Sequence, residues 1–354
     1  MRLWVIGGLA LNLLSACDDD AGCREPDQGL EVGRIAAPVT LRKAVLRTRE
    51  AVIGNLAADA VWNGFNGDPG FQENGEAVPC KHIDSAPQRC IDIAVTNAGG
   101  LRLESACGER SEWREGSIFQ RDVEQLLPFA NDIVAIGVTG RQLYEAYEQS
   151  FALLGQPGRF SWGGGFLHSS GARVMVDCGA QPRLTDEEGQ VRGGQVGARV
   201  VMICTRRHGS VVGQVPNWEP VVRDDDQERI YRVGVNAFLA GGGDEFQMWV
   251  NRSADGTVVP QTLVEPASPG PDQQLMAQYI GELSNGGSEE FDPNARTQAP
   301  GPSEGDCVLS VNSSDARFGA LQDDPQCSVV ENQVVCRLDP SSRLTFLRRN
   351  LCYP

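Results

Sequence analysis

Three stretches of this chain carry most of its structural information: Gly54-Asn55-Leu56-Ala57-Ala58-Asp59-Ala60, Thr96-Asn97-Ala98-Gly99-Gly100-Leu101-Arg102 and Asn236-Ala237-Phe238-Leu239-Ala240-Gly241-Gly242-Gly243-Asp244. A fourth, Leu127-Pro128-Phe129-Ala130-Asn131, stands between the second and the third. The first has apolar residues at helical spacing, whereas the second and third each follow an apolar run typical of a buried strand. Together they predict a fold that mixes helices and strands.

The side chains in these stretches suit a nucleoside or a nucleotide. Phe129 and Phe238 are candidates for stacking on a base, an interaction worth roughly 1 to 3 kcal/mol per base in nucleic-acid systems. Arg102 follows a Gly-Gly pair that lets backbone approach a ligand closely, and its guanidinium suits phosphate or ribose oxygens. Asp244 ends a glycine triplet and can accept hydrogen bonds from a ribose diol.

In their order and wording, the four stretches resemble the nucleotide-recognition half of the 5′-nucleotidase family, from about Leu30 to about Leu283. The resemblance implies that Phe129 and Phe238 stack on the base. It also implies polar base and ribose contacts from Asn97, Gly99 and Asp244, and anion or ribose contacts from Arg47 and Arg102. Two positions depart from the family pattern: Ala237 replaces a frequently polar residue, and Glu245 replaces the usual glycine.

The resemblance implies an α+β fold, specifically a four-layer α/β/β/α sandwich of the 5′-nucleotidase C-terminal domain type, with a small Cys-rich C-terminal tail. The sequence then divides into residues 1–16 as a leader, 17–29 as an acidic linker, 30–284 as the nucleotide-binding domain, 285–305 as a linker and 306–354 as a disulfide-rich tail. The second linker is predicted from its Gly, Pro, Ser and acidic residues.

The 5′-nucleotidase family carries its chemistry in a metallophosphoesterase domain that holds two metal ions. The three histidines here, His82, His168 and His208, are each isolated, and a two-metal site needs ligands that converge. We therefore interpret them as surface or loop histidines and predict no catalytic residue, metal ligand or cofactor in this chain. Divalent metals are expected only in a partner metallophosphoesterase domain.

The first residues predict export. Met1-Arg2 is followed by an apolar stretch from Leu3 to Leu14, too short to span a bilayer as a mature helix, and by the lipobox Leu14-Ser15-Ala16-Cys17. This pattern resembles the signal of bacterial lipoproteins. Cleavage before Cys17 would leave its thiol to carry lipid, and an ordinary signal peptide is the alternative. We expect a protein of the bacterial cell envelope, lipid-anchored on the periplasmic face or the outer surface.

The cysteine count agrees with export. If Cys17 carries lipid, ten of the 11 cysteines remain, an even number that is compatible with disulfides in an oxidising compartment. Spacing favours Cys80 with Cys90, and Cys178 with Cys204 at the ends of two strand-like runs. Zinc is the alternative for the tail cysteines, although no CxxC pair occurs there.

The composition favours one main domain with an appendage. The chain has 354 residues, 41% of them hydrophobic, and a formal net charge of −16. That charge disfavours nucleic-acid polymers, whose binding depends on Lys and Arg neutralising phosphates, whereas a mononucleotide needs only a local positive pocket. We predict helices over 53–62 with Gly64 as the stop, 122–127 and 273–283, and strands over 91–96, 133–138, 172–177, 198–203 and 231–236. Thr139 and Gln142 have capping-box spacing for a further helix.

Two functions of different class follow. In the first, the chain is the nucleotide-recognition part of a 5′-nucleotidase-type phosphohydrolase system, and a separate metallophosphoesterase subunit supplies metals and attacking water. In the second, it is a non-catalytic envelope lipoprotein that binds nucleosides or nucleotides such as AMP. A neighbouring reading frame that encodes the metal domain would distinguish them.

Overall fold

The computed structural model describes residues 29–67, 71–73, 76–78, 90–102, 104–105, 108–109, 111–155, 163–184, 195–206, 218–223, 229–252, 258–261, 267–294, 307–315, 318–331, 333–339 and 342–353. The leader with Cys17 lies outside these residues, as do Cys80, His82 and His208. What the sequence predicts for them therefore stays a prediction.

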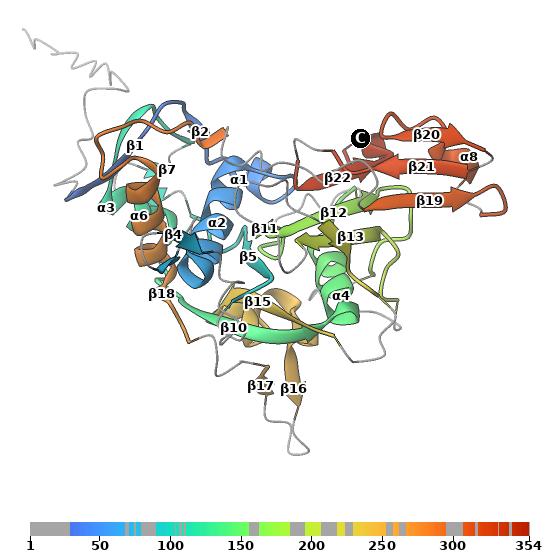
Figure 1. Cartoon of the computed structure of the whole chain (residues 1–354), viewed down its shortest axis with the longest axis horizontal. Helices are drawn as coiled ribbons and strands as arrows, with labels where there is room; N and C mark the ends of the chain where they lie inside the picture. Colours follow the sequence, from blue (N-terminus) through green and yellow to red (C-terminus); the bar gives the residue numbers. More distant parts are fainter. Residues whose placement is uncertain are drawn as a thin grey trace, which may run out of the picture.

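A five-stranded sheet forms the centre of the molecule (Figure 1). Its strands, in spatial order, are β11 (Leu167–Ser170), β5 (Ile93–Asn97), β15 (Ile230–Asn236), β10 (Asp132–Thr139) and β18 (Gly270–Pro271). β15 runs parallel to β5 and antiparallel to β10, and β11 runs antiparallel to β5. The strands predicted over 91–96, 133–138 and 231–236 are thus confirmed with small changes in their ends.

Helices cover this sheet and connect its strands. They are α1 (Lys43–Leu46), α2 (Val52–Asn66), α3 (Gln120–Leu126), α4 (Gly140–Ser150), α5 (Ala237–Ala240) and α6 (Asp272–Leu283). α2 packs on β5, β11 and α6. The capping box at α4 is confirmed, because the Thr139 side chain accepts from the Gln142 N–H and the Gln142 side chain accepts from the Thr139 N–H.

Gly64 does not end α2, contrary to the prediction. The helix continues to Asn66 and is capped by Gly67 at φ 65°. A Cβ atom at Gly64 would fall 2.8 Å from the Leu275 side chain of α6. The glycine therefore allows two helices to approach each other closely, and Gly67 supplies the left-handed conformation that terminates the helix.

A second sheet has the order β14 (Trp218–Pro220), β13 (Val200–Arg206), β12 (Ala172–Asp177) and β22 (Leu344–Leu347). β12 and β13 are antiparallel neighbours, as the sequence suggested, but a Cys178–Cys204 disulfide is wrong. Cys178 follows the last residue of β12, whereas Cys204 pairs with Arg173 near the start of β12. The two cysteines therefore lie at opposite ends of the strand pair. Cys178 instead bonds to Cys352, and Cys204 bonds to Cys307.

The described part of the tail forms a three-stranded sheet in the order β19 (Val308–Asn312), β21 (Gln333–Arg337) and β20 (Cys327–Val330), with the short helix α8 (Phe318–Leu321). The Cys327–Cys336 disulfide joins β20 to β21. β12 is buried along its whole length, because each of its two faces packs against a different group of buried apolar side chains. Val174 and Val176 pack into the main core, whereas Met175 packs with Val334 and Leu338 of the tail.

The tail also reaches α2 through one buried ion pair. Arg343, 4% exposed, donates a 2.6 Å hydrogen bond to the Asp59 carboxylate and a 2.7 Å bond to the Ser169 carbonyl. The Glu50 carboxylate accepts from the N–H groups of Arg343 and Leu344. Residues 342–347 are therefore packed against the main domain by side-chain contacts and by the parallel pairing of β22 with β12.

The remaining strands form two-stranded pairs. These are β1 (Glu31–Ile35) with β9 (Gly116–Phe119), β2 (Val39–Thr40) with β8 (Glu112–Trp113), β3 (Phe71–Glu73) with β4 (Glu76–Val78), β6 (Glu104–Ser105) with β7 (Gly108–Glu109), and β16 (Val250–Arg252) with β17 (Val258–Pro260). Short 3-10 helices are η2 (Gly243–Glu245), η3 (Gln247–Trp249) and η4 (Arg349–Leu351).

The architecture as a whole is mixed α+β with several sheets, as the sequence predicted, and it includes disulfides near the C-terminus. No helix among the described residues combines the length and the apolar character needed to cross a membrane.

Candidate functional site

Four loops meet at one edge of the five-stranded sheet. Asn97 ends β5 and Asn236 ends β15, and these two strands are parallel, so both side chains lie at the same edge. Ile133 at the start of β10 pairs with Asn236, which brings the 127–131 loop to that edge. Leu167 at the start of β11 pairs with Asn97, so the loop of Gly163 to Gly165 arrives there as well. Strand pairing thus gathers segments that lie far apart in sequence.

A chain of side-chain hydrogen bonds connects the loop after β5 to the loop after β15. Asn97 donates through Nδ2 to the Asp244 carboxylate at 2.6 Å and accepts through Oδ1 from Asn236 at 3.0 Å. The Asn236 Oδ1 accepts from the Leu239 N–H at 2.9 Å and so caps α5. Because both amide groups use a donor and an acceptor, the orientation of each side chain is fixed.

Glycines fit closely around Asp244. A Cβ atom at Gly164 would fall 2.7 Å from the Asp244 carboxylate, and one at Gly99 would fall 3.1 Å from the same group. The Gly99 N–H also donates to the Gly164 carbonyl at 2.8 Å, which holds the two loops together. Larger side chains at either position would displace the carboxylate, so both glycines shape the site.

The backbone around Asp244 is left-handed. Asp244 has φ 49° and Glu245 has φ 69°. Glycine adopts this region without strain, whereas most other residues do not. A glycine would therefore adopt the conformation of Glu245 with less strain than the residue present.

Charges interact across the site. Burial raises the pKa of Asp244, while the Asn97 hydrogen bond and the positive charges of Arg47 and Arg102 oppose the rise. Burial lowers the pKa of the Arg47 guanidinium, and Arg102 lowers it further, whereas Asp244 acts in the opposite direction. Arg47 is the C-cap residue of α1, so this short helix positions the Arg47 guanidinium in the site. The two arginines and one carboxylate leave a net positive group that suits an anion.

Both predicted stacking residues are exposed. Phe129 is 55% exposed and Phe238 is 52% exposed, although each belongs to a residue type that is usually buried. The Arg102 guanidinium lies 5.2 Å from the centre of the Phe129 ring, within cation–π range. The Phe238 ring lies directly against Gly243, since a Cβ atom there would fall 2.4 Å from the ring. The Phe129 ring is thus contacted by a residue that follows β5, whereas the Phe238 ring is contacted by its own loop.

The structure therefore brings predicted site residues together at one edge, and contacts or charge interactions link Arg47, Asn97, Gly99, Arg102 and Asp244. Sequence reasoning missed two further residues. Asn236 stands inside the third stretch, and its position directly after a strand was the available signal. Gly164 belongs to the run Gly163-Gly164-Gly165, and only the strand register shows that it reaches Asp244.

His168 is not a surface or loop histidine, and that prediction is wrong. It lies on β11, is 1% exposed, and its Nε2 is 3.0 Å from the Leu46 carbonyl. A carbonyl only accepts, so Nε2 carries the proton. Burial lowers the His168 pKa to about 4. Within the described ranges, no group of three or more His, Cys, Asp or Glu side chains is placed to hold a metal ion.

Known proteins match this chain in sequence and structure. The human protein named 5′-nucleotidase is 28% identical over 205 residues, which cover 57% of this chain and 27% of the human protein. Snake venom 5′-nucleotidase from Macrovipera lebetinus is 26% identical over 222 residues, which cover 62% of this chain and 43% of that protein. The crystal structure of a 5′-nucleotidase precursor from Thermus thermophilus superposes with a TM-score of 0.45 at 24% identity, covering 72% of this chain and 37% of that one.

This chain spans less than half the length of each of these relatives. The family model described as "5′-nucleotidase, C-terminal domain" matches residues 31–251. The matched segment contains the four stretches and every residue of the sheet edge described above. Because the match covers more than half of the sequence, the chain belongs to the 5′-nucleotidase C-terminal domain family.

Proposed function

We propose that this protein binds a nucleoside or a nucleotide at the edge of the five-stranded sheet. The observation that carries the proposal is the Asn97–Asp244 hydrogen bond, which sets a half-buried carboxylate beside two arginines and close to the loop that bears Phe238. Membership of the family supports a nucleotide-binding role. The exposed Phe129 and Phe238 rings offer apolar faces for a base.

Each group has a distinct part in this proposal. Phe129 and Phe238 stack on the base, and stacking of this kind is worth about 1 to 3 kcal/mol per base. Asp244 accepts hydrogen bonds from the ribose hydroxyls while Asn97 holds it in place. Arg47 and Arg102 bind the phosphate of a nucleotide, since guanidinium groups match phosphate oxygens in geometry and charge.

We further propose that hydrolysis, where it occurs, takes place on a separate metallophosphoesterase. Relatives of greater length carry the name 5′-nucleotidase, and this chain spans only part of each. In such a system the present chain orients the nucleotide, and the partner supplies the metal-activated water. If no partner acts with it, the chain is a nucleoside- or nucleotide-binding protein without catalysis.

Calorimetry with adenosine and AMP tests recognition. We expect both to bind, and Phe238→Ala to weaken adenosine binding by about 1 to 3 kcal/mol. Ile230→Ala is the matched control, because Ile230 is 50% exposed and lies at the start of β15, at the opposite end of that strand from α5, which carries Phe238. Absence of heat with any of several nucleosides and nucleotides, in oxidised and folded protein, would remove the proposal.

A phosphate-release assay addresses hydrolysis separately. The purified chain with AMP and manganese, zinc, cobalt or magnesium is expected to stay at background until a metallophosphoesterase is added. Stimulation of such an enzyme by this chain supports the two-part system, whereas binding without stimulation supports the non-catalytic alternative. Metal-dependent turnover by the chain alone, lost in Asp244→Ala, would place the chemistry here.

We also propose that the mature protein is anchored in the cell envelope by lipid on Cys17. The lipobox motivates this proposal, and the disulfides of the described residues suit an oxidising compartment. Labelling with palmitate should disappear in Cys17→Ala. Equal labelling of both proteins would argue against the anchor.

A further inference from the structure

A cavity of about 840 Å³ opens between the start of α2 and the C-terminal part of the chain, on a different part of the molecule from the sheet edge described above. Its walls come from three segments, 49–55, 320–326 and 342–351, together with Asn294 and Asp339. The volume lies in the range of pockets that hold small organic ligands. Apolar side chains, including Val52, Phe346 and Leu351, share the lining with charged ones.

Two carboxylates of the lining are engaged with backbone donors. Glu50 accepts from the N–H groups of Arg343 and Leu344 and from the Ser342 hydroxyl. Asp324 accepts from the N–H of Gln326 at 2.9 Å and from that of Arg348 at 2.5 Å. These acids therefore satisfy the backbone of the tail and form no ion pair with the arginines of the cavity among the described residues.

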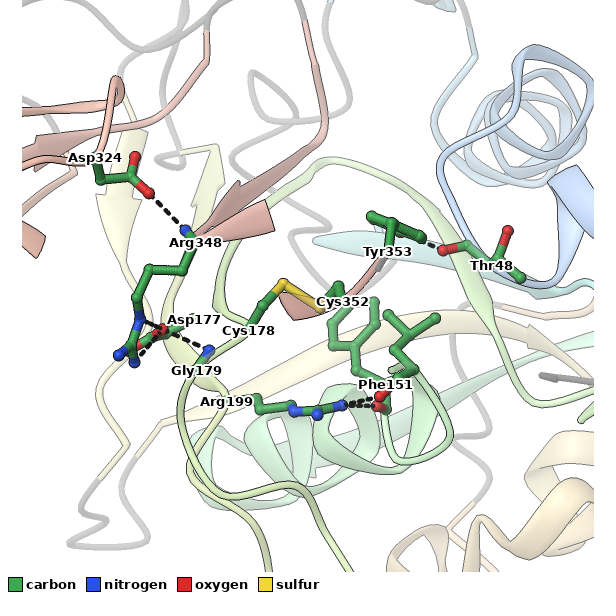
Figure 2. The surroundings of a disulfide bond; sticks show 11 residues. Thr48, Phe151, Asp177, Cys178, Gly179, Arg199, Asp324, Arg348, Cys352 and Tyr353 are labelled. Carbon is green, nitrogen blue, oxygen red and sulfur yellow. Dashed lines mark hydrogen bonds and ion pairs between the residues drawn. A yellow bond between two sulfur atoms is a disulfide. The ribbon is translucent and has the colours of Figure 1, made fainter. Parts of the chain in front are cut away.

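Arg348 is neutralised within the wall. Its Nε and Nη2 donate to the two oxygens of Asp177 at 2.6 and 2.5 Å, and Asp177 is completely buried. Figure 2 shows Arg348 extending from the Asp324 side to Asp177, next to the Cys178–Cys352 disulfide. A bidentate pair of this kind fixes the guanidinium in the wall.

Arg49 and Arg349 are the arginines of the cavity for which the described residues provide no carboxylate partner. Both are exposed, both line the cavity, and neither has an acidic side chain within ion-pair distance in the part of the chain that the structure describes. Their guanidinium carbons lie 5.6 and 5.7 Å from the centre of the same ring, that of Tyr353. Two like charges are thus held around one aromatic ring, an arrangement that an anion between them would stabilise.

The supports of both arginines are rigid. Tyr353 follows Cys352, which is joined to Cys178, and its hydroxyl donates to the Thr48 carbonyl, as Figure 2 shows. Arg349 lies between Arg348, which is paired with Asp177, and Cys352. Arg49 lies between Thr48 and Glu50, which both bond to the tail. Because the backbone on each side is already fixed, little ordering is lost when a ligand binds.

We propose that this cavity is a second binding site, for a small organic anion that carries a carboxylate or phosphate group on an apolar body. The anionic group binds between the Arg49 and Arg349 guanidiniums, and the apolar body contacts Val52, Phe346 and Leu351. Asp323 and Asp339 also line the cavity, and their carboxylates disfavour ligands that carry more than one negatively charged group. The site is independent of the nucleotide-binding residues, so its test does not depend on the function proposed above.

Phenyl phosphate and benzoate are suitable probes, with benzyl alcohol as the uncharged analogue, all titrated into the oxidised full chain by calorimetry. We expect saturable binding of at least one anion and none of the alcohol. The comparison between the two anions identifies the group that the arginines prefer. Arg49→Gln and Arg349→Gln should each weaken binding about tenfold, the effect of one lost charged hydrogen bond.

Arg223→Gln is the matched control, because Arg223 also stacks on a tyrosine, 5.1 Å from the Tyr144 ring, but does not line the cavity. Arg102→Gln serves as the control for the nucleotide site. Binding that is unchanged in both controls and lost in the cavity variants supports the proposal. Binding lost in Arg102→Gln but retained in Arg49→Gln, or no saturable binding of either anion, overturns it.

Chemical protection tests the site without any substitution. Phenylglyoxal modifies accessible guanidinium groups, and peptide mass spectrometry reports the modification of Arg49 and Arg349 separately. The anion that binds in calorimetry should slow modification of these two arginines and leave that of Arg223 unchanged. Equal rates with and without the anion would contradict the proposed location even if a substituted protein fails to fold.

Discussion

The side chains of Asn97 and Asp244 are 147 positions apart in sequence, yet they form a 2.6 Å hydrogen bond at the ends of segments carried by two neighbouring strands. The bond orients the carboxylate and also affects its pKa. Burial raises the pKa of Asp244, and the hydrogen bond from Asn97 opposes that rise. The same contact therefore links the fold of the sheet edge to its electrostatics.

Substitution of Asn97 by Asp should make stability depend strongly on pH. Two carboxylates at this distance cannot both ionise without repulsion, so the folded-state pKa of the pair rises. A raised carboxyl pKa stabilises the fold at low pH, and this contribution is lost as the pH rises. Relative to the wild-type protein, Asn97→Asp should lose about 1 to 3 kcal/mol of unfolding free energy between pH 5 and pH 8, measured by urea denaturation. Asn97→Ala adds no charge but removes the hydrogen bond that opposes the rise in the Asp244 pKa, so it should show a smaller dependence of the same sign.

Gly54→Ala should destabilise the protein although alanine is the better helix former. A Cβ atom at Gly54 would fall 2.2 Å from the buried His168 ring, so α2 and β11 would have to separate. Overpacking of this kind costs about 1 to 3 kcal/mol, more than the gain of about 1 kcal/mol in helix propensity. Gly319→Ala in α8, where no neighbouring atom lies within 4 Å of the new Cβ, should be neutral or slightly stabilising. Thermal unfolding distinguishes the two.

The buried Arg343–Asp59 pair should behave differently when one partner or both are removed. Arg343→Met or Asp59→Asn alone leaves a buried charge without its partner, and we expect a loss of about 3 to 5 kcal/mol in either case. The double variant should lose clearly less than the sum of the two. Additive losses in denaturant titrations would mean that the pair contributes no coupling.

His168 should contribute to acid sensitivity. Its pKa is lowered from 6.5 to about 4 by burial, so protonation favours the unfolded chain. The contribution to stability is complete above pH 6.5 and is lost as the pH falls through about 4. A shift of this size corresponds to about 3 kcal/mol. His168→Gln should flatten this part of the stability profile, and an unchanged profile would exclude His168 as its origin.

Local patterns in the sequence predicted much of the sheet edge. Asn97 ends one apolar run and Phe238 stands two positions after the strand that another run forms, and continuity of apolar residues is a local property that identifies such strands. The capping box at Thr139 was predictable for the same reason, because both of its residues lie within one turn. The positions of Arg47 and Gly164 relative to Asp244 depend on strand order and register, which no local pattern specifies.

Partners across long separations were not predictable. Arg343 reaches Asp59 from 284 positions away, and nothing near Arg343 in sequence indicates α2 as its neighbour. Cysteine spacing suggested Cys178 with Cys204, but spacing contains no information on strand direction. The isolation of His168 in sequence does not indicate exposure, because its neighbours Leu167 and Ser169 belong to a buried strand.

The Cys178–Cys352 disulfide also constrains the order of assembly. Cys178 leaves the ribosome 174 residues before its partner, and Cys204 precedes Cys307 by 103 residues. During that interval the partner cysteines have not yet been synthesised, and neither has β22, the strand that pairs in parallel with β12. Antiparallel pairing of β12 with β13 places Cys178 and Cys204 at opposite ends of the strand pair, so these two strands cannot bring the two thiols together before their partners are present.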